Sequence, residues 1–126
     1  MMKNLNETQI KSLVTGVKLA AELEASDCNL RCFISIFAYQ FNELGEYVEM
    51  TKFLKTVNDE DVFFTLRKYE IPDEFIKNGW YASEDDLVNS VYIEDIRGYK
   101  NIGDELLKYM SDLSSLEPEW KCEIPL

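Results

Sequence analysis

The stretch LRCFISIFAYQFNEL, residues 30–44, is the most apolar part of this chain, and it decides which fold the sequence predicts. Its apolar side chains recur at the i, i+3, i+4, i+7 spacing that places them on one face of an α-helix. They are Leu30, Phe33, Ile34, Phe37, Ala38, Phe41 and Leu44. Asp27 precedes the stretch as a candidate N-cap, and Gly45 follows it where a helix favours a left-handed residue. We therefore expect a central apolar helix that other elements cover.

Start and stop signals in the flanking sequence predict further helices. Asn6 or Thr8 can cap the first one, acids at 59–61 and Pro72 delimit another, and Ser83 with Asp86 resembles a capping box. The segments are about 6–25, 46–57, 58–71, 72–79, 83–98 and 101–113. The fold class that this predicts is all-α, a compact bundle of five to six short helices around the central apolar helix. We expect one domain over residues 1–126, with an extended tail from about residue 114.

A strand interpretation of the middle of the chain is the alternative. Between Phe33 and Ile71 the content of aromatic and β-branched residues is high, which is typical of strands. An α+β fold would have a hairpin at about 32–54 that turns at residues 42–45, and a further strand in DVFFTLRKYEI, residues 61–71. The helical interpretation is preferred because residues 30–44 fit a 3.6-residue period and do not alternate.

The charge balance limits the partners of this chain. Its 24 acids and 13 bases give a formal charge of −11. Binding to nucleic acid or to an anionic membrane requires clustered Lys and Arg, so neither is expected. Residues 82–126 hold 11 acids and 4 bases, a net charge of −7, which favours a basic protein as partner. The lack of a signal-peptide pattern and the odd number of cysteines predict a cytoplasmic protein.

The sequence does not predict an enzyme. It has no histidine, which excludes Ser-His-Asp and Cys-His catalysis and most zinc sites. Cys28 and Cys32 do not form a Cys-x-x-Cys motif, and the acid clusters do not match a calcium loop. We expect no catalytic residues, no metal and no cofactor.

The candidate site residues are therefore partner-binding ones. Large aromatic residues outside the predicted helices are typical interface anchors, and acids near them could face a basic surface. The set comprises Trp80, Tyr81, Glu84, Asp85, Asp86, Glu94, Asp95 and Trp120. Ordinary packing of the rings on the core and a solvated acidic surface would explain the same residues.

The function predicted from these features is a small acidic protein-binding module. It would be an inhibitor, an immunity protein or an anti-defence protein that binds a basic partner, including a nucleic-acid-binding one that it could block by DNA mimicry. The alternative is a structural or regulatory helical module that acts as a homodimer, in which exposed apolar surface matters more than charge.

Two segments also resemble a known family. FAYQFNELGEYVEM, residues 37–50, followed by RKYEIP, residues 67–72, loosely resembles the opening of antirestriction proteins from mobile elements. These proteins are acidic DNA mimics, so the resemblance implies a similar role and strands in this part of the chain. The sequence departs from the family in lacking its Gly- and Trp-bearing pattern and in a shorter spacer. No residue role is carried over.

Overall fold

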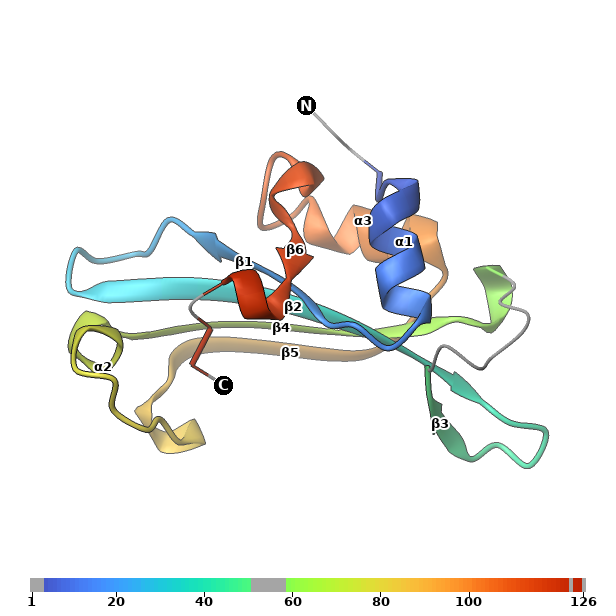
Figure 1. The fold of residues 1–126 in the computed structure, drawn as a ribbon, viewed down its shortest axis with the longest axis horizontal. Coiled ribbons are helices and arrows are strands. Elements are labelled where there is room, and N and C mark those ends of the chain that lie inside the picture. Colours follow the sequence, from blue (N-terminus) through green and yellow to red (C-terminus); the bar gives the residue numbers. More distant parts are fainter. Residues whose placement is uncertain (1–3, 51–58, 123, 126) are drawn as a thin grey trace.

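The fold is one antiparallel β-sheet with short helices. The computed structural model describes residues 4–50, 59–122 and 124–125, and its six strands have the order β5-β4-β2-β1-β6, with β3 paired to β2 (Figure 1). The strands are β1 (Leu19–Leu23), β2 (Leu30–Phe41), β3 (Tyr47–Glu49), β4 (Phe63–Pro72), β5 (Val88–Arg97) and β6 (Glu117–Pro118). The α-helices of the described residues are α1 (Glu7–Val14), α2 (Asp73–Lys77) and α3 (Tyr99–Leu106). Single 3₁₀ turns occur at η1 (Asp59–Asp61), η2 (Glu84–Asp86), η3 (Leu113–Ser115) and η4 (Glu119–Lys121).

The prediction of an all-α bundle is wrong, and its central helix is strand β2. This strand lies inside the sheet, between β1 and β4, and most of its residues are buried. Ile34 and Ile36 face one side of the sheet, whereas Phe33 faces the other. A strand that is covered on both sides has apolar residues at successive positions instead of alternating ones. Because most positions of this run are apolar, apolar pairs occur at the helical spacings i+3, i+4 and i+7 even though the segment is a strand.

The main core lies between the sheet and the two longer helices. Even-numbered residues of β2 and β4, including Ile34, Ile36, Phe64 and Leu66, pack with Leu13 of α1 and with Ile102 and Leu106 of α3. Figure 1 shows α1 and α3 on the same side of the sheet. Side chains alternate between the two faces of a strand, so the odd-numbered residues face the opposite side.

The strand alternative describes the middle of the chain correctly. Residues 39–41 pair with 47–49, and the side-chain oxygen of Asn42 accepts hydrogen bonds from the N–H groups of Leu44 and Glu46 in the turn. Gly45 has a φ of 77°, which an L side chain rarely adopts. The predicted strand over 61–71 is β4, and residues 51–54 of the predicted hairpin lie outside the described residues.

Most of the remaining predicted helices are shorter or are strands. The first helix ends at Val14 because Gly16 has a φ of 93°, and β1 follows where the sequence predicts helix to residue 25. Of the predicted helix at 58–71, residue 58 lies outside the described residues, residues 59–61 form the 3₁₀ turn η1, and residues 63–71 belong to β4. Asp59 instead accepts a hydrogen bond from the N–H of Tyr99 (2.7 Å) and so caps α3. Of the predicted helix at 46–57, residues 47–49 form β3 and 51–57 are not described.

In the C-terminal third, too, the predicted helix-capping residues are correct, whereas part of the predicted helices are strands or single turns. Asp73–Lys77 is helical as predicted, and Ser83 and Asp86 form the predicted capping box. That box opens a single 3₁₀ turn, because residues 88–97, rich in β-branched and aromatic residues, pair with β4. The predicted helix at 101–113 is α3, over Tyr99–Leu106. The tail is not simply extended, since β6 pairs with β1 and η4 follows it.

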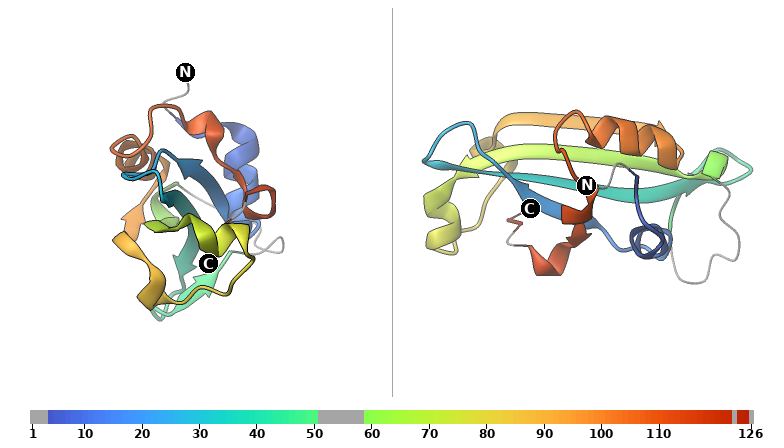
Figure 2. Two further views of the ribbon diagram at one scale, coloured as in Figure 1. Left: turned by 90° about the vertical axis from the view of Figure 1, so that its left-hand side faces the viewer. Right: turned by 90° about the horizontal axis from the view of Figure 1, so that it is seen from above.

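The second face of the sheet is covered at one end. There Phe33, Tyr69 and Ile71 are buried under Phe75 and Ile76 of α2 and under Ile124 of the tail. Figure 2 shows α2 at this end of the sheet, away from α1 and α3. Among the described elements, no α-helix packs on the other half of this face.

The buried carboxylate of Glu70 links β4 to the β1–β2 loop and to β5, at the end of the sheet where α2 lies. Glu70 of β4 accepts hydrogen bonds from the N–H and the hydroxyl of Ser26 (2.6 and 2.9 Å) and from the Asn89 amide (2.6 Å). The bond from the Ser26 N–H is the largest of the effects that hold the pKa of Glu70 below its usual value, against the opposing effect of burial. Asn89 has a φ of 53° at an irregular position of β5, so Glu70 also fixes that irregularity.

We predict that Glu70→Gln lowers the free energy of unfolding at pH 7 by about 1–3 kcal/mol, because a charged acceptor of three bonds is lost. A lowered pKa in the folded state stabilises it above the unfolded pKa, and this contribution is lost as the pH falls below about 4.5. Urea denaturation should therefore show a difference between variant and wild type that shrinks from pH 7 to pH 3. The exposed Glu74→Gln on α2 is the matched control, and an equal effect of both variants would contradict the role of Glu70.

Candidate functional site

The uncovered half of the second sheet face is lined by aromatic rings. We call this set the aromatic face; it comprises Phe37, Tyr39 and Phe41 of β2, Tyr47 of β3, Phe63 of β4 and Tyr92 of β5. The strand registers bring them together, because Tyr39 lies opposite Phe63 and Phe41 lies opposite Tyr47. Strand positions i and i+2 share a face, which places the three β2 rings in one row.

Tyr39 is the centre of this cluster. Its ring centroid lies 5.0 Å from that of Tyr47, 5.6 Å from Phe41, 6.0 Å from Phe37 and 6.1 Å from Phe63. Phe41 and Phe63 also make an edge contact at 5.0 Å. Tyr39 itself is buried, whereas Tyr47 is 50% exposed and Tyr92 59% exposed. The buried ring of Tyr39 and the half-buried rings of Phe37 and Phe63 thus form the floor, and exposed rings stand at its margin.

The Tyr39 hydroxyl fixes the adjacent edge strand. It accepts a hydrogen bond from the N–H of Asp95 (2.7 Å) and donates one to the Asp95 carboxylate. Asp95 has a φ of 59°, a left-handed conformation that aspartate tolerates better than most residues. Burial, and next the hydrogen bond with the Asp95 carboxylate, raise the pKa of Tyr39 to about 12. The phenol is therefore neutral at pH 7, and it holds the Glu94–Asp95 segment beside the rings.

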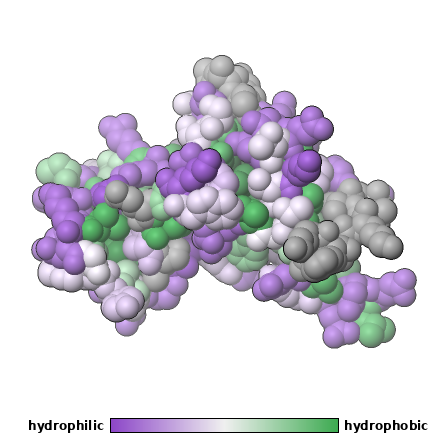
Figure 3. Space-filling view, viewed as in Figure 1, coloured by the Kyte–Doolittle hydropathy of each residue, from purple (hydrophilic) through white to green (hydrophobic). Residues whose placement is uncertain are grey.

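Three hollows that share lining residues lie on the aromatic face and at its margins. The largest, of about 430 Å³, is lined by five of the rings together with Thr65, Glu94 and Asp95. A second, of about 300 Å³, shares Phe37 and Tyr47 with it and reaches Lys18 and Glu119. A third, of about 350 Å³, shares Tyr92 and reaches Arg67 and Glu84. Figure 3 shows the outline hollowed below the middle of the sheet, between the α2 end and the β2–β3 hairpin.

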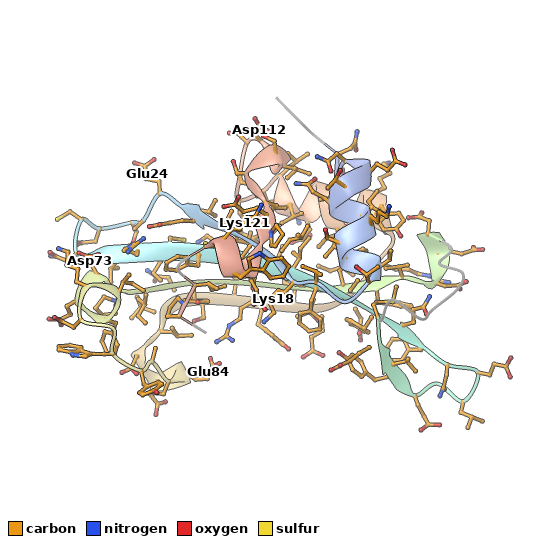
Figure 4. All side chains as sticks on the ribbon, in the orientation of Figure 1. Lys18, Glu24, Asp73, Glu84, Asp112 and Lys121 are labelled. Atoms are coloured by element: carbon orange, nitrogen blue, oxygen red, sulfur yellow. The ribbon has the colours of Figure 1, made fainter. Side chains whose placement is uncertain are left out.

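The charged side chains that line these hollows are mostly acidic. They are the carboxylates of Glu49, Glu84, Glu94, Asp95 and Glu119 and the cations of Lys18 and Arg67. Five negative and two positive groups leave a net charge of −3. Both cations are already paired, Lys18 with Glu119 (3.8 Å) and Arg67 with Glu84. Figure 4 places Lys18 below the middle of the sheet and Glu84 toward its α2 end.

The structure separates the predicted partner-binding residues into two groups. Glu84, Glu94 and Asp95 line the hollows of the aromatic face. The other predicted residues do not line these three hollows: Trp80, Tyr81, Asp85, Asp86 and Trp120. Trp80 packs edge-on against Phe75 at 5.5 Å, Tyr81 is fully exposed, and Asp86 bonds to Ser83 within η2. Trp120 is 69% exposed on η4.

The aromatic face itself was not predicted. The sequence places Phe37 and Phe41 on the apolar side of the expected central helix, and Phe63 within the expected helix at 58–71. The signal that identifies them is the alternation Phe37-x-Tyr39-x-Phe41, which places three rings on one face of a strand. The alternation is incomplete, because the positions between the rings hold the apolar Ala38 and the polar Gln40.

The described residues provide no group of three or more Cys, Asp or Glu side chains placed to hold a metal ion. The three cysteines are unpaired thiols, and burial raises the pKa of the Cys32 thiol and of the Cys122 thiol. None of the described helices combines the length and apolar character that crossing a bilayer requires.

Comparisons with known proteins do not assign a family. No protein-family model matches the chain, and no curated protein and no solved structure is significantly similar to it. The resemblance of residues 37–50 and 67–72 to antirestriction proteins therefore has no support from a family model. In the structure these segments belong to β2, β3 and β4, and they contribute four rings of the aromatic face and buried positions beside it.

We predict that Tyr39→Phe lowers the free energy of unfolding by about 1 kcal/mol, because the Asp95 N–H loses its acceptor. Amide hydrogen exchange at Asp95 should become faster, whereas exchange at Ile34 in the main core should keep its rank among the slowest amides. Tyr47→Phe, which removes an exposed hydroxyl from the same cluster, is the control and should leave both measurements unchanged. Equal protection of the Asp95 amide in Tyr39→Phe and wild type would show that the hydroxyl does not hold this strand.

Proposed function

We propose that this protein binds a basic protein partner through the aromatic face and the carboxylates around it, and acts as an inhibitor, an immunity protein or an anti-defence protein. The observation that carries the proposal is the combination of exposed rings with a net charge of −3 in three neighbouring hollows. Rings supply contact area at low entropic cost, and complementary charge raises the rate of association.

The exposed rings support binding because they have no covering element among the described residues. Tyr47 and Tyr92 stand at the margin of the hollow, and Phe41 is exposed beside them. Leu44, at the tip of the β2–β3 hairpin, is exposed as well. An exposed apolar patch bordered by charged groups is typical of an interaction surface.

The charges favour a basic protein over nucleic acid as partner. A phosphate-binding face needs cations that are free to replace counterions. Here Lys18 and Arg67 are each paired with a carboxylate of the same face, and Glu49, Glu94 and Asp95 add further negative charge. A partner whose own basic groove binds phosphates would accept these carboxylates in their place, so the proposal extends to DNA mimicry.

A homodimer is the second candidate, and the position of β5 favours it. This strand lies at the edge of the sheet, and its Val88 and Tyr92 side chains are exposed. An exposed edge strand can pair with the same strand of a second copy. Two copies would each carry a formal charge of −11, which opposes self-association at low salt. For this candidate, sedimentation should show a monomer at low salt and a dimer when salt is raised.

The proposed location is the cytoplasm. Cys28, Cys32 and Cys122 are free thiols, as is usual in a reducing compartment.

The proposal predicts that reversing charge on the aromatic face abolishes binding. Immobilised protein should capture a basic protein from a lysate of its native host at about 50 mM salt and release it at about 500 mM. The double variant Glu49→Lys/Glu94→Lys should retain at least about tenfold less of that protein, because it reverses the charge beside the rings.

The control reverses two exposed acids elsewhere, Glu24→Lys/Asp104→Lys, and so makes the same change in net charge. It should capture the basic protein nearly as well as wild type does. Capture that survives about 500 mM salt, or that the control variant loses as completely as the aromatic-face variant does, would argue against this site.

A further inference from the structure

The second sheet face already holds three guanidinium groups of the chain itself, in its covered and in its uncovered half. Three arginines each lie over an aromatic ring: Arg31 is 5.6 Å from the Phe33 centroid, Arg67 is 5.1 Å from that of Tyr69, and Arg97 is 5.6 Å from that of Phe63. These distances lie within the range of favourable cation–π contacts.

Each of these arginines also donates to an oxygen beside its ring. Arg31 makes a two-pronged bond to the Glu22 carboxylate, with Nε–Oε2 at 2.8 Å and Nη2–Oε1 at 2.6 Å. Arg67 donates to the Glu84 carboxylate, and Arg97 donates to the backbone carbonyl of Glu60. One ring and one oxygen acceptor per guanidinium is therefore a repeated arrangement on this face.

The largest hollow has the same components without a guanidinium. Its lining provides rings, including Tyr47 and Tyr92, and the carboxylates of Glu94 and Asp95, and none of the described residues that line it is Lys or Arg. Asp95 is held by Tyr39. Burial, and next the nearby Glu94 carboxylate, raise the pKa of the Tyr92 phenol, which is consistent with Glu94 lining the same hollow.

We propose that this hollow takes an arginine side chain of the basic partner, with its guanidinium against the Tyr47 and Tyr92 rings and within reach of Glu94. This inference rests on the proposed function and specifies which chemical group of the partner binds in the hollow. The volume of about 430 Å³ falls in the range of ligand-binding pockets, roughly 300–1,000 Å³, and admits one long side chain.

Arginine fits this hollow better than lysine does. A guanidinium is planar and weakly hydrated, so it stacks on a ring and donates in its plane to a carboxylate at the same time. The ammonium of lysine is strongly hydrated and meets only one of these partners well. A nucleobase could also stack on the rings, but its phosphates would face Glu94 and Asp95, which repel them.

The test compares hexa-arginine with hexa-lysine, two peptides of equal charge, by isothermal titration calorimetry at about 50 mM salt. Wild type should bind hexa-arginine at least about fivefold more tightly than hexa-lysine. In Tyr47→Ala/Tyr92→Ala this preference should fall to within about twofold, because only charge remains to attract the peptides. Both tyrosines are exposed, so the variant should fold, which circular dichroism checks. Glu94→Gln is a second variant that keeps both rings and should weaken hexa-arginine binding.

The matched control is Trp120→Ala, which removes an exposed ring outside the hollows and should keep the preference. Equal binding of the two peptides by wild type, weakened by salt, would overturn the arginine site and leave the proposed function intact. Binding of neither peptide would overturn both proposals, and so would tighter binding of a single-stranded oligothymidine. A preference for arginine that Trp120→Ala loses and Tyr47→Ala/Tyr92→Ala keeps would overturn the site and place the anchor at η4.

Discussion

The pairing of β2 with β4 is the constraint on which the rest of the structure depends. The register runs without interruption from Leu30 opposite Pro72 to Tyr39 opposite Phe63. It assigns each residue of both strands to a face, so that Ile34 lies under the helices and Tyr39 on the aromatic face. Since side chains alternate, a shift of one residue would exchange the two faces entirely. Burial of the helix-covered core therefore also fixes the composition of the exposed face.

The edge strand β5 is irregular at two places, and each irregularity is held by a polar side chain from the interior of the sheet. Asn89 and Asp95 both have left-handed φ values, and the register with β4 shifts near each of them. Glu70 accepts from the Asn89 side chain, and Tyr39 accepts from the Asp95 backbone. Irregular edges pair poorly with other edges, so the two irregularities limit any pairing of β5 with a second copy to the short regular segment between them. The irregularity at Asp95 also places its carboxylate beside the rings. The same backbone feature therefore makes the strand edge irregular and contributes an acid to the site.

The sequence predicted where helices begin and end better than it predicted which segments are helices or strands. Asn6 caps α1 through the Gln9 N–H, Ser83 and Asp86 form their box, and a helix follows Pro72, because such signals depend on neighbouring residues only. The type of β2 was not predictable from period alone, since burial on both faces removes alternation. Asp59 shows a further limit: it stands where an acid favours a helix start, but the helix that it caps begins 40 residues later at Tyr99. Pairing between segments distant in the sequence determined whether these segments became helices or strands, which the local signals did not determine.

The sequence predicted three of the five acids of the site and none of its rings, for a physical reason. Glu84, Glu94 and Asp95 stand out because they are charged wherever the chain places them, whereas a ring is read as core until the fold leaves it exposed. A sheet face with this many rings would ordinarily be covered or would associate with itself. Carboxylates around the rings oppose self-association, because two copies that carry the same charge repel each other. A cation that reaches both the rings and the carboxylates meets no such barrier, and this difference is the physical basis on which we propose a basic partner.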